Sequence, residues 1–159
     1  MVLSHKEIAR FMRMGTNQPE GELAKRIDDL LADAPLEPKG VWMRHNEKFL
    51  LCGTIGSKFD IWHRRLSLSS ATDALIVQAI GAAAVEKVMD GLEEEIKLSL
   101  SPSEKINHRR SPGYPNYPIS LNLEITTLLD TAKRIGVSTT DSMLLIPSKS
   151  VAAICEVIK

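Results

Sequence analysis

The sequence predicts a single α+β domain over residues 1–159, with a largely antiparallel sheet and packed helices. Helix-like and strand-like segments alternate irregularly, without the regular βαβ repeat of a parallel sheet. Two strand-like runs are separated only by "NE", which favours a hairpin. A chain of 159 residues, 43% hydrophobic and 25% charged, is long enough for one core but not for two.

The first half of the chain contains helices on both sides of the predicted hairpin. Residues 4–14 form a short amphipathic helix with Ser4 as a plausible cap. "ELAKRIDDLLADA" predicts a second helix, which Pro35 and Pro38 end. "GVWMRH" and "KFLLCGTIG" are the predicted strands, and "SKFDIWHRRLSL" predicts another helix.

The longest predicted helix runs from about Thr72 to Lys97. Its small residues at 79–84 would let another backbone approach closely, which indicates a central, buried helix. Glu86 follows this stretch, either at the solvent edge of the helix or aimed into a cleft, and periodicity alone favours the solvent edge. Glu93 to Glu95 are expected to form a solvated face.

The C-terminal third predicts one helix and two strands. "SLNLEITTLLDTAKRIGV" indicates a single helix, closed by Gly136 as a C-cap. The residues expected in register on it are Leu123, Thr127, Leu128 and Thr131. "SMLLIPSKSVAAICEVI" supplies two short strands hinged at Pro147.

Charge and composition argue against several classes of function. The formal net charge is zero, whereas nucleic acids and anionic membranes normally require a basic surplus in their partners. Cys52 and Cys155 have no metal-type spacing, so we expect reduced thiols. The N-terminus mixes charged and apolar residues unlike a signal peptide, and no apolar run has the ~20 residues of a membrane span. The expected compartment is the cytoplasm.

The stretch "RRSPGYPNYP", Arg109 to Pro118, is the most unusual in the chain. Each proline fixes φ near −65° and lacks an N–H donor, so the segment is predicted to be a stiff loop. Arg109 offers a fork of donors for a carboxylate or phosphate, Gly113 leaves the backbone open, and Tyr114 adds a flat face. A small zwitterionic or aromatic ligand would suit these groups. Equally, the loop could be a rigid surface turn whose arginines pair with acidic helices.

The pattern Arg-x-x-x-Gly-Tyr-Pro-x-x-Pro resembles the signature loop of the activation domain of cobalamin-dependent methionine synthase. The long helix, the strand end "CGTIG" and the closing segment "RIGVSTTDSMLLIPSKSV" also resemble segments of that domain, in the same order. The resemblance covers residues 50–151 well and the N-terminal helices loosely. The stretch between Val41 and Phe49 and the C-terminal end are shorter than in the family. The chain is thus identified as a free-standing, shortened member.

The resemblance implies a fold, a ligand and a reaction. The family's domain binds S-adenosylmethionine and donates its methyl group to cobalamin, while an electron donor such as a flavodoxin reduces the cobalt. By this resemblance the chain is an S-adenosylmethionine-binding reactivation subunit for a corrinoid methyltransferase, with methionine synthase the expected partner. It would be a methyltransferase only in complex with that partner, since it lacks the Asp-x-His-x-x-Gly pattern of many cobalamin-binding proteins.

Site residues carry over from the family position by position. Arg109 matches the loop arginine, Tyr114 the loop tyrosine, and Gly113 with the backbone of Arg110 the stretch that lies along the ligand. Glu86 matches an acidic ligand-binding residue of the long helix, which reverses the solvent-edge interpretation. No acid–base residue is implied, because the family's catalysis consists mostly of positioning. The alternatives are a docking module for a cobalamin-binding partner that no longer binds S-adenosylmethionine, and a sensor of S-adenosylmethionine for another system.

Overall fold

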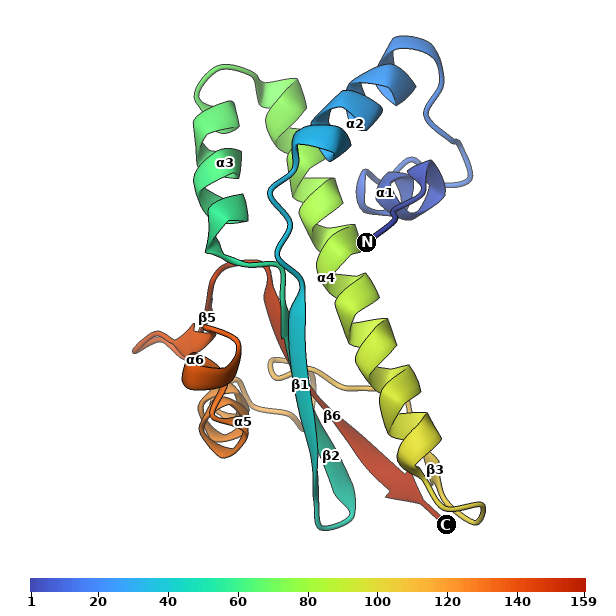
Figure 1. Ribbon diagram of the computed structural model, residues 1–159, viewed down its shortest axis with the longest axis vertical. Helices are drawn as coiled ribbons and strands as arrows, with labels where there is room; N and C mark the ends of the chain where they lie inside the picture. The colour runs from blue at the N-terminus through green and yellow to red at the C-terminus, as the bar shows by residue number, and fades with distance from the viewer.

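A computed structural model of the protein describes all residues from 1 to 159 (Figure 1). The helices are α1 (His5–Phe11), α2 (Gly21–Asp33), α3 (Ser57–Ser67), α4 (Ala71–Ser99), α5 (Leu121–Leu129) and α6 (Thr131–Arg134). The strands are β1 (Lys39–His45), β2 (Lys48–Thr54), β3 (Lys105–Ile106), β4 (Ser138–Thr139), β5 (Leu145–Ile146) and β6 (Ser150–Ile158).

The main sheet has four strands in the order β1-β2-β6-β3, and every neighbouring pair is antiparallel. The predicted hairpin is confirmed: β1 pairs with β2 so that His45 faces Lys48 across a two-residue turn, in which Asn46 takes a positive φ of 57°. β4 and β5 form a separate two-stranded ribbon. The α+β class with a largely antiparallel sheet is therefore confirmed.

The two faces of the main sheet pack against different helices. Successive side chains of a strand point to opposite faces of the sheet. Phe49 and Leu51 of β2 pack in one cluster with the C-terminal half of α4. Leu50 and Cys52, which alternate with them, pack in another cluster with α5. β2 is thus buried on both faces, which explains why it reads as a continuous apolar run.

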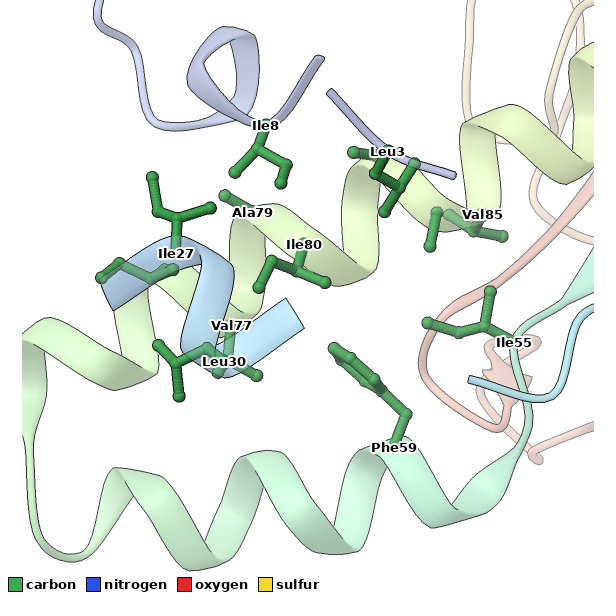
Figure 2. Close-up of a cluster of buried hydrophobic side chains, with 13 residues drawn as sticks. Leu3, Ile8, Ile27, Leu30, Ile55, Phe59, Val77, Ala79, Ile80 and Val85 are labelled. Atoms are coloured by element: carbon green, nitrogen blue, oxygen red, sulfur yellow. The ribbon is translucent and has the colours of Figure 1, made fainter. Parts of the chain in front are cut away.

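Helix α4 joins this sheet to a second, purely helical part of the molecule. Its 29 residues extend about 44 Å, along the sheet at one end and among α1, α2 and α3 at the other (Figure 1). Figure 2 shows Ile8, Ile27 and Phe59, from three different helices, gathered around Ile80 of α4. This helical part holds the largest of the three buried apolar clusters.

The predicted burial of the small residues of α4 is confirmed at Gly81, where a side chain rather than another backbone approaches. A Cβ built on Gly81 would lie 2.6 Å from the ring of Phe59, so α3 rests directly on this position. The sheet makes a similar approach at Gly53, where a Cβ would lie 2.8 Å from the side chain of Val88. A side chain at either glycine would push two layers of the fold apart.

The single helix predicted over residues 120–137 is wrong. Asp130 adopts a left-handed conformation (φ 51°) that separates α5 from α6, and aspartate is one of the few residue types that tolerate it. The Thr131 hydroxyl then donates 2.7 Å to the carbonyl of Val137, which folds the chain back toward the sheet. The predicted register is also wrong, because Leu123 and Leu128 are exposed. The residues that α5 buries are Asn122, Ile125, Thr126 and Leu129.

The remaining elements agree with prediction, apart from the two-residue strands β3 and β4, which the sequence did not indicate. Both cysteines are unpaired and buried, and burial raises the pKa of the Cys52 thiol to about 12. No helix combines the length and the apolar character that crossing a bilayer requires.

Candidate functional site

The edge of the main sheet positions the loop Arg109–Pro118. Arg110 pairs with Ile154 of β6 through two backbone hydrogen bonds, each 2.9 Å long. Successive residues of extended backbone face opposite sides of a sheet. Ile154 belongs to the cluster beneath α5, so its partner Arg110 starts from the same face of the sheet. Arg109 precedes Arg110 in the chain and therefore faces α4.

Hydrogen bonds within the loop fix its shape after Arg110. The N–H of Gly113 donates to the carbonyl of Tyr117 (2.7 Å), and the N–H of Tyr117 donates to the carbonyl of Tyr114 (2.9 Å). Gly113 has a φ of 101°, a conformation that only glycine adopts without strain. The Tyr114 ring projects outward and is 64% exposed. The predicted stiff loop is therefore confirmed, with Tyr114 at its tip.

The Arg109 guanidinium is buried, with 8% of its side chain exposed, and bonds three carboxylates of α4. It donates to Glu86 (2.5 Å), to Asp90 (2.8 Å) and to Glu93. Positions 86, 90 and 93 lie four and three residues apart, the spacing that places side chains on one face of a helix. Arg109 thus ties the loop to the C-terminal half of α4.

The cluster carries more negative than positive charge. Three carboxylates face one guanidinium, and the imidazole of His108 lies 3.7 Å from Glu93. With that imidazole counted as neutral, two negative charges are uncompensated. Burial lowers the pKa of Arg109, but the hydrogen bonds to Asp90 and Glu86 and the charges of Glu86 and Glu93 outweigh it, so that the pKa is raised. The guanidinium is therefore permanently charged, and the surplus favours a cation nearby.

The prediction that Glu93 lies on a solvated face is wrong. Glu93 was expected there with Glu94 and Glu95, but it is buried and receives the Arg109 hydrogen bond. A carboxylate is buried when a cation accompanies it, and this cation comes from a loop 16 residues away. Glu94 and Glu95 are exposed, as predicted.

A hollow of about 310 Å³ opens beside this cluster, and we call it the charged hollow. Its lining residues come from α1, α4 and the loop: Arg10, Phe11, Glu86, His108, Arg109, Arg110, Ser111 and Tyr114. The Glu86 side chain is 43% exposed, so one side of this carboxylate remains open while the other bonds Arg109. Of the three α4 acids around Arg109, only Glu86 lines the hollow.

A second hollow of about 490 Å³ shares Glu86, Ser111 and Tyr114 with the charged hollow, and we call it the adjoining hollow. Its other lining residues come from the loop, α5, β5 and the start of β6: Pro112, Asn122, Leu144, Leu145, Ser148, Ser150, Val151 and Ala152. The two hollows together fall within the usual size of a site for a small ligand. One end is charged, and the other mixes apolar side chains with hydroxyls.

The largest hollow, about 650 Å³, lies elsewhere, between the β1–β2 turn and α5. Its charged groups include Glu47, Lys48, Glu124 and Glu156. None of the predicted site residues lines it. The charged and adjoining hollows are therefore the candidate site.

The structure brings Glu86, Arg109, Arg110 and Tyr114 together around the charged hollow. Gly113 lines neither hollow, and its N–H is bonded within the loop. The Arg110 N–H donates to Ile154, so a ligand beside the loop cannot receive that bond as well. The Arg110 carbonyl also accepts from the N–H of Ile154, and the prediction that this backbone lies along a ligand stays a prediction.

The charged groups and the helix α1 residues of the site that were not predicted include Arg10, Phe11, Asp90 and Glu93. The spacing of Asp90 and Glu93 from Glu86 could have revealed them, since all three lie on one helix face. Arg10 and Phe11 carried no such signal, because α1 reaches the loop only through tertiary packing against α4.

Comparison with known proteins gives a fold and no sequence family. No family model and no curated protein matches the sequence. Among solved structures, the crystal structure of the MetH reactivation domain bound to AdoHcy matches with a TM-score of 0.68. The match covers 96% of this chain and 73% of that chain, at 14% sequence identity.

The chain has the fold of the MetH reactivation domain. The fold expected from the loop motif is thereby confirmed over nearly the whole chain, including the N-terminal helices that the sequence resemblance covered only loosely. At 14% identity the likeness extends to the fold alone.

Proposed function

We propose that this chain is a cytoplasmic reactivation subunit that binds S-adenosylmethionine and presents its methyl group to cobalamin on a partner protein. The observation that carries the proposal is the convergence of Glu86, Arg109 and Tyr114 on one site, within the fold of the MetH reactivation domain. These residues match the family's loop and helix pattern, and 23 residues separate Glu86 from Arg109 along the chain.

The charge of the site supports a cationic ligand. S-adenosylmethionine carries a sulfonium, an ammonium and a carboxylate, so its net charge is positive. The surplus of negative charge around Arg109 favours such a molecule, and the open side of Glu86 is the natural contact for its ammonium. Arg109 would hold Glu86 in place as well as contribute charge.

The two hollows support the same ligand by their chemistry. The amino acid end of S-adenosylmethionine would occupy the charged hollow, and the nucleoside would occupy the adjoining hollow beside Leu144 and Val151. Tyr114 stands between the hollows, where its exposed ring can cover the ligand. The task of the chain would be to hold and orient the methyl donor.

The partner would supply the remaining chemistry. Its cobalamin would provide the cobalt that accepts the methyl group, and an electron donor such as a flavodoxin would provide the electron that makes the cobalt nucleophilic. The chain itself would contribute the donor and a docking surface around the Tyr114 tip. Exposed apolar side chains near that tip, at Ile119 and Leu144, suit contact with a protein.

One observation favours the docking module without a methyl donor. All three contacts of the Arg109 guanidinium are made within the chain, so no free fork remains for a ligand carboxylate. Such a module would still bind a cobalamin protein, but S-adenosylmethionine would neither bind nor change that association.

The test combines the protein, a corrinoid protein loaded with cob(II)alamin, a reductant and methyl-labelled S-adenosylmethionine. We expect the label on cobalamin, with the matching spectral change, only when all four components are present. Association with the corrinoid protein without label transfer would favour the docking module over the reactivation subunit. Transfer of the label to another acceptor without a corrinoid protein would refute the reactivation function.

A further inference from the structure

Helix α1 places Arg10, a cation outside the loop motif, beside the loop. We infer that Arg10 binds the carboxylate of the ligand, and that α1 thereby completes the charged hollow. This inference rests on the proposed function, because it assigns the carboxylate end of S-adenosylmethionine.

The carboxylate needs a cation other than Arg109. The Arg109 guanidinium is buried and already bonds Glu86, Asp90 and Glu93. A ligand carboxylate at Arg109 would have to displace one of these bonds and lie among the remaining carboxylates. Like charges repel at such distances, so the site disfavours a further anion there.

Two other arginines line the charged hollow, and Arg10 is the better placed. Arg110 pairs with Ile154, whose side chain lies beneath α5, so although Arg110 lines the hollow, its side chain leaves the backbone on the face opposite α4. Arg10 is exposed and forms no ion pair or hydrogen bond through its guanidinium. Its guanidinium lies 5.7 Å from the ring of Phe11, which also lines the hollow.

The packing of α1 against α4 fixes the position of the helix that carries Arg10. Ile8 is fully buried in the helical cluster with α4. Lys87, the neighbour of Glu86, donates to Glu7 (3.1 Å) and to the carbonyl of Val2 (2.5 Å). Glu7 and Arg10 are three residues apart and share a face of α1, so the contact that anchors Glu7 directs Arg10 toward the Glu86 side of α4.

The arrangement separates the two charges of an amino acid between two helices. Glu86 on α4 would bind the ammonium, and Arg10 on α1 would bind the carboxylate as a forked, charge-assisted pair. A ligand without the carboxylate would lose the α1 contact only. Arg10 would therefore determine specificity for the intact amino acid end.

The experiment measures the binding of S-adenosylmethionine and of decarboxylated S-adenosylmethionine by equilibrium dialysis. We expect Arg10→Ala to weaken S-adenosylmethionine about 10-fold or more, as for loss of a charged hydrogen bond, and to leave the decarboxylated compound unchanged. Arg10→Lys should restore part of the affinity. The matched control is Arg13→Ala, because Arg13 is exposed in the same segment and lines neither hollow.

Three results would overturn the inference. Equal weakening of both compounds by Arg10→Ala would mean that α1 matters only to the shape of the hollow. Unchanged binding of S-adenosylmethionine would place the carboxylate elsewhere. Failure of the wild-type chain to bind either compound would instead refute the proposed function, and the inference with it.

Discussion

Two arginines of this protein, Arg44 and Arg109, hold carboxylates in opposite ways. Arg44 on β1 forms a forked pair with Glu104 through contacts of 2.8 and 3.1 Å, near the surface and with the charges balanced. Arg109 is buried under three carboxylates, and the charges do not balance. Balanced surface pairs contribute little to stability, whereas a buried cluster with a charge surplus must be maintained against a desolvation cost. The difference is the reason to test the Arg109 cluster as the candidate site.

The largest effect is expected from removing the guanidinium at the centre of the cluster. Arg109→Met leaves Glu93 buried without its cation, which should cost about 3–5 kcal/mol of the free energy of unfolding. Arg44→Met should cost less, because the Arg44 side chain is 40% exposed and water can replace it beside Glu104. Urea denaturation of both variants measures the difference. Equal losses would mean that Arg109 is only another surface pair.

A second variant separates charge from packing at Arg109. Adding Glu86→Gln, Asp90→Asn and Glu93→Gln to Arg109→Met removes the uncompensated charges while keeping similar shapes. Stability should then recover part of the loss, since the penalty comes mainly from the buried carboxylate of Glu93. No recovery would show that the guanidinium acts through its packing.

Ligand affinity is the next test of the comparison. Glu86→Gln should weaken S-adenosylmethionine about 10-fold, since the charged contact to the ammonium becomes a neutral one, while the fold persists. Glu94→Gln is the matched control, because Glu94 lies on the same helix, pairs with Lys97 and lines neither hollow. Calorimetric titration compares the two. Normal affinity of the Glu86→Gln variant would mean that Glu86 has only a structural role beside Arg109.

The smallest effect concerns the balanced pair at acid pH. The hydrogen bond from Arg44, helped by those from Ser101, lowers the pKa of Glu104 to about 2. Because the folded pKa lies below that of an unfolded glutamate, about 4.3, the pair stabilises the fold above pH ~4.3. This contribution is lost as the pH falls from ~4.3 toward ~2. Melting temperatures of the wild type and Arg44→Met should therefore converge over that range. A constant difference would place the effect of Arg44 outside this ion pair.

The sequence could predict those parts of the fold and site that depend on local chemistry. The "NE" turn, the prolines of the loop and the small residues of α4 each allow few conformations, and all three appear as predicted. The resemblance also singled out Glu86 and Arg109, which the structure joins in an ion pair, and their role in binding a ligand stays a prediction.

The failures came from contacts between distant segments. Glu93 looked like a solvated glutamate because its cation lies in a loop that only the folded sheet brings near. The break at Asp130 depends on Thr131 bonding Val137, and helix period could not reveal it. Arg10 lies 76 positions before Glu86 and reaches the site through the packing of α1.

The central claim is that the hollows beside Arg109 bind S-adenosylmethionine, and titration calorimetry with thermal unfolding tests it most directly. We predict a saturable binding heat, with S-adenosylhomocysteine competing for the same site. The ligand should stabilise the fold by about 2.7 kcal/mol at a hundredfold excess over its dissociation constant. No heat and no change in melting temperature with millimolar S-adenosylmethionine, in the presence or absence of a corrinoid partner, would contradict the claim.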